Sequence, residues 1–198
     1  MAISAEHVNK LRQETGAGVM DCKRALEETQ GDYGKAKELI RRKGLESAAG
    51  KAGKATKTGR VGVYVHGGGV GAAMVELTCE TDFVAKNEEF QDLLKELAVA
   101  VYGFNPAALT KEDLPKEQVE EEKKKYEEEI KGKPPAIAEK IVEGKLEKNL
   151  YSQKCLLHMP FPKEDKFKGT YGDFLKSKVA VLKENIVIRR FHRLEACK

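Results

Sequence analysis

The sequence lacks the features that would place the protein in a membrane or outside the cell. No apolar run in its 198 residues approaches the roughly 20 residues that a membrane-spanning helix needs. The first residues do not combine a basic start, an apolar middle and a small-residue cleavage site, as a signal peptide does. We therefore expect a cytoplasmic protein that is not associated with a membrane.

Cysteine is scarce and widely spaced. The four cysteines, Cys22, Cys79, Cys155 and Cys197, include no C-x-x-C pair, whereas a structural zinc site needs ligands clustered by short turns. The four histidines are isolated as well. The sequence therefore predicts no metal site and no cofactor, and the cysteines are interpreted as reduced thiols of a cytosolic protein.

Charge of one sign is not in large excess. Lys and Arg number 36 against 32 Asp and Glu, which gives a formal net charge of +4 at pH 7. Cations recur every three residues at Lys51, Lys54, Lys57 and Arg60, but no aromatic side chain is interleaved for base stacking. We expect a solvated linker here and no direct binding of nucleic acid.

Residues 1–44 predict a three-helix module. Apolar side chains recur at helical spacing in three short segments, which turns at Gly16–Gly18 and at Gly31 separate. Cations followed by Gly44 are typical of a helix end. Residues 45–59, rich in alanine, glycine and lysine, predict a helical linker.

An α+β core is predicted over residues 60–198. Alternating apolar residues over 60–65 and 72–79, joined by a glycine-rich loop, favour an antiparallel hairpin. The alternating segment 186–194 predicts a last strand that closes a three- or four-stranded antiparallel sheet packed by helices. A charged helix is expected over 115–131.

Two patterns suggest catalysis only weakly. The glycine-rich segment His66–Gly71 invites a phosphate-loop interpretation, but it leads into another predicted strand and no Lys-Ser/Thr follows. Glu76 and Glu80 lie on one face of a strand with Asp82 nearby, yet no nucleophile, histidine or metal set accompanies them in sequence. A hairpin turn and surface acids are the favoured interpretations. We do not expect an enzyme, although the sequence does not exclude one.

The segment 75–90 joins a predicted buried strand to an amphipathic helix. Phe83 follows Asp82 at the break between the two elements. An apolar side chain at such a corner either packs into its own core or projects toward a partner. The pattern alone leaves both interpretations open.

Three stretches together resemble the elongation factor Ts family, whose bacterial members are guanine-nucleotide exchange factors of the GTPase elongation factor Tu. The stretches are Leu11–Leu26, Glu76–Lys86 around Thr-Asp-Phe-Val, and Gly132–Lys145. They occur in family order and bracket most of the chain. The resemblance implies an α+β fold with a small three-helix N-terminal module similar to ubiquitin-associated domains, a linker, and a core of antiparallel sheet and helices.

The resemblance also implies a function in translation elongation. In the family, the Thr-Asp-Phe-Val segment inserts into the G domain of GDP-bound elongation factor Tu, disturbs Mg²⁺ coordination and promotes GDP release so that GTP can bind. N-terminal positions lie against the same G domain. The matching residues are Thr81, Asp82, Phe83 and Val84 in the inserted segment, and Arg12, Met20 and Lys23 in the N-terminal module.

The chain departs from the family's long form. It reaches the stretch that starts at Gly132 too early for a second core subdomain and a protruding helical hairpin, so a compact form is expected. Self-association as a homodimer stays open, with Val119, Tyr126 and Ile130 or the terminal strand as candidate surfaces. The alternative function is a protein-binding or chaperone module that is recruited through its N-terminal helices and has no exchange activity.

Overall fold

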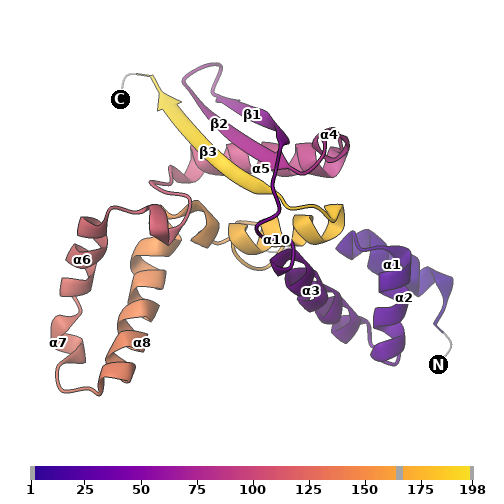
Figure 1. The fold of residues 1–198 in the computed structure, drawn as a ribbon, viewed down its shortest axis with the longest axis horizontal. Coiled ribbons are helices and arrows are strands. Elements are labelled where there is room, and N and C mark those ends of the chain that lie inside the picture. The colour runs from indigo at the N-terminus through magenta and orange to yellow at the C-terminus, as the bar shows by residue number, and fades with distance from the viewer. Residues whose placement is uncertain (1–2, 164–166, 197–198) are drawn as a thin grey trace. The chain divides into compact units, whose positions relative to one another are not determined.

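The computed structural model describes residues 3–163 and 167–196. These residues form helices and a three-stranded antiparallel sheet of order β1-β2-β3 (Figure 1), so the α+β class is confirmed. None of the described helices has the length and apolar character that crossing a bilayer requires. The chain folds into two units. One consists of Met1–Gly59, Thr78–Leu93 and Leu175–Val187, and the other of Arg60–Leu77, Leu94–Phe174 and Ile188–Lys198.

The N-terminal part of the first unit contains three helices, as predicted. They are α1 (Ala5–Thr15), α2 (Val19–Glu28) and α3 (Tyr33–Ala49). Ser4 caps α1 and Asp32 caps α3, because each side chain accepts a hydrogen bond from a backbone N–H of the first turn. The helices share an apolar core of Val8, Leu11, Cys22, Ala25, Leu26 and Ala36.

Gly44 does not end α3, in contrast to the prediction from its position after three cations. The helix continues through it to Ala49. A Cβ atom at position 44 would lie 3.1 Å from the Cβ of Ala180 on α10 (Tyr171–Leu182), closer than side chains normally approach. The glycine therefore allows α3 to pack tightly and does not serve as a cap.

The helical linker predicted over 45–59 is wrong beyond Ala49. The chain turns over residues 50–53, is irregular over 54–57, and enters β1 at Thr58. Two glycines in this segment lower its helix propensity. Ala52 and Ala55 are exposed, so the segment presents no apolar stripe whose packing as a helix would compensate for the glycines.

The sheet confirms the predicted hairpin and last strand. Its strands are β1 (Thr58–His66), β2 (Gly71–Cys79) and β3 (Val187–Glu195). The register of β2 and β3 is visible at both ends: Ala196 N donates to the Val70 carbonyl at 2.9 Å, and Thr78 Oγ1 donates to the Val187 carbonyl at 3.2 Å. The residue numbers rise on one strand as they fall on the other, which is antiparallel pairing.

Helix α5 (Glu88–Phe104) lies behind the strands and covers one face of the sheet (Figure 1). Alternate residues of β2 face it, because successive side chains of a strand point to opposite faces. The residues buried on these two elements include Ala73, Val75, Leu77, Phe90, Leu93, Leu94, Leu97, Ala98 and Val101.

The charged helix predicted over 115–131 is broken in two, α6 (Lys116–Lys124) and α7 (Glu127–Ile130). Tyr126 lies at the break, where it is buried. Its hydroxyl donates to Glu122 Oε1 at 2.5 Å and accepts from Asn149 Nδ2 at 2.9 Å. Tyr126 is therefore part of the core beneath these helices and does not offer a surface for self-association.

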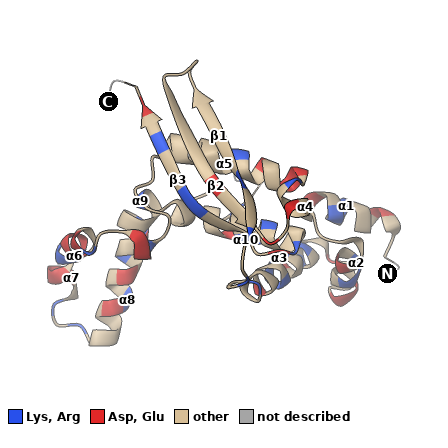
Figure 2. Ribbon diagram, turned by 45° about the horizontal axis from the view of Figure 1, so that its top comes forward, with Lys and Arg blue, Asp and Glu red and all other residues tan. Residues whose placement is uncertain are grey.

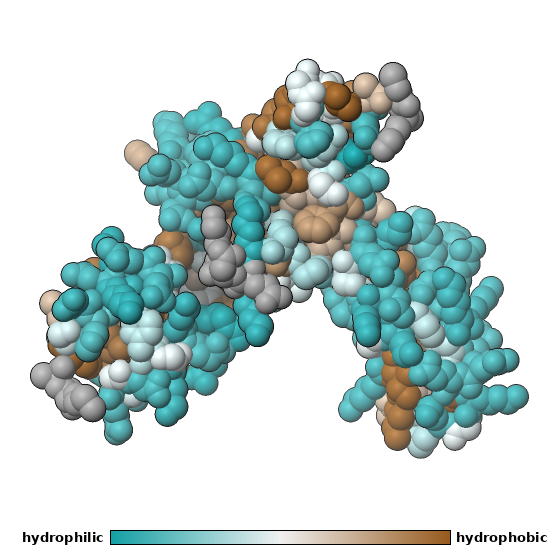
Figure 3. Space-filling view, turned by 180° about the vertical axis from the view of Figure 1, so that it is seen from behind, coloured by the Kyte–Doolittle hydropathy of each residue, from teal (hydrophilic) through white to brown (hydrophobic). Residues whose placement is uncertain are grey.

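These helices pair with α8 (Pro135–Leu146) to form a helical hairpin. The expectation, drawn from the early position of Gly132, that the chain is too short for a helical hairpin is therefore wrong. The hairpin carries charges of both signs (Figure 2) and a strip of apolar atoms on the face shown at the lower right of Figure 3. The remaining elements are α4 (Asp82–Ala85), η1 (Lys111–Asp113), the π-helical turn η2 (Glu147–Tyr151), α9 (Ser152–Lys154) and η3 (Leu156–His158).

Three of the four cysteines lie in the described part of the chain. Cys22, Cys79 and Cys155 are free thiols, and all three are buried. Cys197 lies outside the described residues.

Candidate partner-binding site

The turn after β2 projects Phe83 into solvent. Thr81 is the N-cap of α4, and its Oγ1 accepts a hydrogen bond from Val84 N at 3.4 Å. In this short helix the Phe83 side chain is 81% exposed, Val84 is half-buried and Ala85 is buried. Of the two interpretations that the sequence left open, burial of Phe83 in its own core is therefore wrong.

Glu184, in the connection from α10 to β3, holds the backbone that leads into this turn. Its Oε2 accepts hydrogen bonds from Glu80 N and from Thr81 N, both at 3.0 Å. Its Oε1 accepts from Thr81 Oγ1 at 2.6 Å. Hydrogen bonds to a carboxylate are stronger than neutral ones, so one side chain restrains both residues that precede α4.

Glu80 in turn binds the residue that follows Glu184. Its Oε1 accepts a hydrogen bond from Asn185 N at 2.7 Å, and Asn185 Nδ2 donates to the carbonyl of Lys54 at 2.7 Å. The hydrogen bond from the backbone N–H of Asn185, followed by the positive charge of Lys54, holds the pKa of the Glu80 carboxyl below its usual value. We call Glu80, Thr81, Glu184 and Asn185 the carboxylate clasp.

Asp82 is paired within its own helix. Its Oδ2 accepts from Lys86 Nζ at 2.7 Å, an i,i+4 ion pair on the surface. This hydrogen bond and the lysine charge lower the pKa of the Asp82 carboxyl. An acid in the first turn also favours the helix electrostatically. Asp82 therefore supports the corner from which Phe83 projects.

The N-terminal candidates lie on α1 and α2. Arg12 and Lys23 are exposed, and Lys23 Nζ lies 3.9 Å from Glu27 Oε1. Met20 is 62% exposed at the start of α2, and Val19 beside it is exposed too. Val19 and Met20 are therefore two neighbouring apolar side chains that are accessible to a partner.

The patterns that suggested catalysis have structural explanations. The segment His66–Gly71 joins β1 to β2 as a hairpin turn. Glu76 Oε2 accepts from Arg190 Nε at 2.7 Å across β2 and β3. Within residues 3–163 and 167–196, no three side chains of His, Cys, Asp or Glu are grouped so that they could hold a metal ion.

Sequence reasoning missed Glu184 and Asn185. They are more than one hundred positions from the turn that they hold, and neither belongs to a recognisable motif. Glu80 was interpreted as a surface acid. Its alternation with Glu76 on one strand face was the only signal, and it does not identify a partner.

Comparison with known proteins identifies the family of the chain. A family model described as Elongation factor TS matches residues 35–168. Elongation factor Ts of Thermodesulfovibrio yellowstonii is 48% identical over 196 residues, which is 98% of this chain and 96% of the relative. That of Maridesulfovibrio salexigens is 50% identical over 196 residues, 98% of this chain and 94% of the relative.

A third relative, Elongation factor Ts of Coprothermobacter proteolyticus, is 48% identical over 195 residues, which cover 98% of both chains. Matches of this identity and coverage define the chain as a translation elongation factor. It belongs to the elongation factor Ts family. Because the matches span nearly the whole of each relative, these relatives share its compact length.

Proposed function

We propose that the chain is a guanine-nucleotide exchange factor that acts in the cytoplasm on GDP-bound elongation factor Tu. The observation that carries the proposal is the exposure of Phe83, 81%, on a capped and clasped turn. In this proposal the segment from Thr81 to Val84 enters the partner's G domain, disturbs the Mg²⁺ coordination there and promotes release of GDP.

The physical balance supports this role. Phe83 does not contribute to its own core, so its burial in a complex gains roughly 1.5–3 kcal/mol without a matching loss of stability. A Mg²⁺ ion that bridges nucleotide phosphates and protein ligands supplies a large electrostatic term, which is lost with its geometry. The factor by which this chain weakens GDP binding equals the factor by which GDP weakens binding of this chain. Exchange therefore needs no covalent chemistry, and so no enzyme activity or cofactor, in this protein.

The N-terminal module supplies a second contact in this proposal. Arg12, Met20 and Lys23 would lie against the G domain, with the exposed Val19 and Met20 as its apolar part. The three-helix arrangement with short turns suits a module of the ubiquitin-associated kind, which presents one helical surface to a partner protein. No binding of nucleic acid is part of the proposal.

Release of fluorescent GDP from elongation factor Tu tests the function. We expect stoichiometric amounts of this protein to accelerate release strongly. Unchanged release would refute exchange activity. Binding to elongation factor Tu without acceleration would support the alternative of a recruitment or chaperone module.

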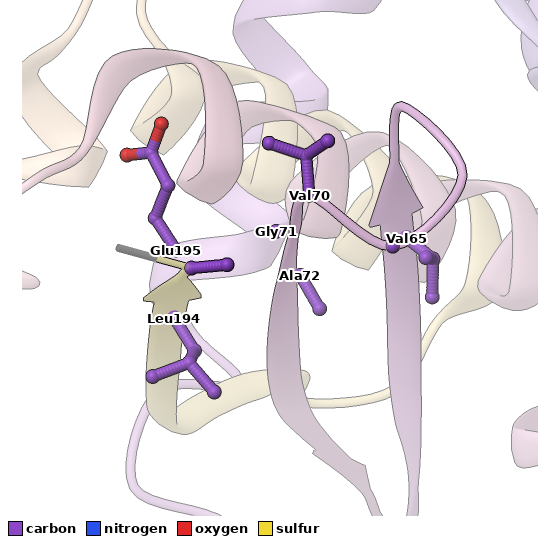
Figure 4. Close-up of a pocket in the computed structure, with 8 residues that line it drawn as sticks. Val65, Val70, Gly71, Ala72, Leu194 and Glu195 are labelled. Carbon is purple, nitrogen blue, oxygen red and sulfur yellow. The ribbon is translucent and has the colours of Figure 1, made fainter. Parts of the chain in front are cut away.

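We also propose that a second copy of the chain covers the outer face of the sheet. Strands β1 and β2 carry few charged residues (Figure 2), and the tip of the sheet is lined by Val65, Val70, Ala72 and Leu194 (Figure 4). Apolar patches of this kind mark interfaces. The exposed apolar side chains are Val61, Val63, Val65, Met74 and Leu194.

Analytical ultracentrifugation tests the homodimer. We expect the wild-type protein to sediment as a dimer. The variant Val63→Lys, which places a charge in the middle of β1, should sediment mainly as a monomer. Ile137→Lys is the matched control, because Ile137 is an exposed apolar residue on α8. A monomeric wild-type protein at micromolar concentration would rule out this use of the sheet face.

A further inference from the structure

Two acidic side chains interlock below the Phe83 turn. Glu184 accepts from the backbone of Glu80 and Thr81, while Glu80 accepts from the backbone of Asn185. Each carboxylate thus holds the chain segment that carries the other. We propose that the carboxylate clasp holds Phe83 in its partner-binding orientation before the partner arrives, with Glu184 as the positioning residue. The inference rests on the proposed exchange function.

The turn needs such support because it has little of its own. Helix α4 consists of only four residues, Asp82–Ala85, and an isolated helical turn does not pay for its own nucleation. Ala85 is the buried residue of this helix, whereas Asp82 and Phe83 are exposed. Packing therefore restrains the end of the helix, and hydrogen bonds must restrain its start.

The clasp acts at that start. The Thr81 hydroxyl both donates to Glu184 Oε1 and accepts from Val84 N. Its rotation is thereby set by Glu184, and the cap that it forms is oriented toward α4. A charge-assisted bond of 2.6 Å to the capping hydroxyl makes the conformation of the turn depend on a residue outside it.

The clasp also includes the segment before β1. The Asn185 side chain is buried and donates to the Lys54 carbonyl, and Lys54 Nζ lies 3.5 Å from Glu80 Oε2. Buried polar groups are normally hydrogen-bonded, as Asn185 Nδ2 is here. Close by, the hydroxyl groups of Thr56 and Thr78 lie 2.9 Å apart. Segments far apart in sequence therefore meet at the base of one exposed phenylalanine.

The expected consequence concerns affinity more than maximal rate. If only a fraction of molecules holds the turn in its binding orientation, the apparent dissociation constant rises by the inverse of that fraction. Once bound, Phe83 occupies the same place in the partner. Loss of the clasp should therefore raise the concentration needed for half-maximal GDP release and leave the maximal rate nearly unchanged.

The first experiment titrates GDP-bound elongation factor Tu with Glu184 variants. Glu184→Ala should raise the half-maximal concentration at least about tenfold, since it removes several bonds to a charged acceptor. Glu184→Gln keeps an acceptor in place and should show a smaller rise. Glu89→Ala is the matched control, because Glu89 pairs with Lys178 in the same unit; it should titrate like the wild type.

A second experiment observes the turn directly. The sequence contains no tryptophan, so Phe83→Trp introduces a single tryptophan at the turn, whose emission can be excited selectively over that of the tyrosines. Its steady-state anisotropy should fall when Glu184→Ala or Glu184→Gln is added, and should not fall with Glu89→Ala. If the clasp contributed only to global stability, the Glu184 substitutions would lower the melting temperature with Phe83 and with Phe83→Trp alike. They would then leave the anisotropy of the folded protein unchanged.

The outcomes separate the inference from the function on which it rests. If the wild type does not release GDP, the exchange function is refuted, while the anisotropy still tests the clasp. If the wild type is active but Glu184→Ala and Glu184→Gln titrate as the wild type does, the clasp is refuted. In the Phe83→Ala background, Glu184→Ala should add little, because both changes act on one contact. Full additivity would also overturn the proposal.

Discussion

Phe83 and Phe90 occur on either side of one short bend and have opposite environments. Phe83 is 81% exposed on α4, whereas Phe90 is 0% exposed on α5. Two phenylalanines in one stretch of sequence therefore have different roles. Phe90 anchors the helix in the core, and Phe83 is left free for a contact outside the chain.

The two phenylalanines give a matched pair of variants. Phe83→Ala should leave the free energy of unfolding within about 0.5 kcal/mol of the wild type and should strongly reduce GDP release. Phe90→Ala should lower that free energy by about 3–5 kcal/mol, because it leaves a cavity. Urea denaturation and the release assay measure the two effects. A large loss of stability in Phe83→Ala would contradict the placement of this side chain.

Gly62 is predicted to be intolerant of any side chain. A Cβ atom on this β1 residue would lie 2.5 Å from Cγ of Leu94 and 2.9 Å from its Cδ1, so strand and helix would have to separate. Gly62→Ala should cost about 1–3 kcal/mol of stability. Gly103→Ala on α5 is the control, since a Cβ there meets no atom of the described chain within 4 Å. Equal midpoints for the two variants in urea would count against this packing.

Stability should fall at acidic pH partly through the clasp. The pKa of Glu80 is lowered in the folded protein, first by the Asn185 amide, so the unfolded chain binds more protons as the pH falls. The stabilisation is therefore complete above the unfolded pKa of about 4.3 and is lost as the pH falls through the lower, folded value. Glu80→Gln should be less stable than the wild type at neutral pH, and the difference should shrink as the pH falls below the unfolded pKa of about 4.3. A difference that stays constant across this range would contradict the assignment.

The buried thiols should be unreactive in the folded protein. Burial raises the pKa of Cys155 to about 11 and also raises that of Cys22, while Cys79 is buried too. In a Cys197→Ser variant, a disulfide reagent at about pH 8 should titrate almost no thiol in the native state, because only the thiolate attacks. All three remaining thiols should react in guanidinium. Fast native labelling of any of them would show that its surroundings open.

Part of this structure follows from local pattern. The hairpin of β1 and β2 and the strand β3 were predicted from alternation, and the three N-terminal helices from apolar spacing and caps. These signals act over a few residues. Local rules failed at Gly44, where a cap-like pattern is overridden because the glycine lies against Ala180. They failed again at Tyr126, where a buried hydrogen-bonded side chain breaks a helix of high charge.

For the candidate site, the sequence by itself determined that Thr81 to Val84 form a corner between a strand and a helix, with an acid beside an aromatic. Alternation, capping residues and the family resemblance are enough for that. Only the tertiary structure decided that Phe83 points into solvent and that Glu184 and Asn185 hold the turn below it. The reason is that exposure and hydrogen bonding depend on segments that come together only in the folded chain. Glu80 and Glu184 are far apart in sequence, and no local pattern indicates that they are in contact.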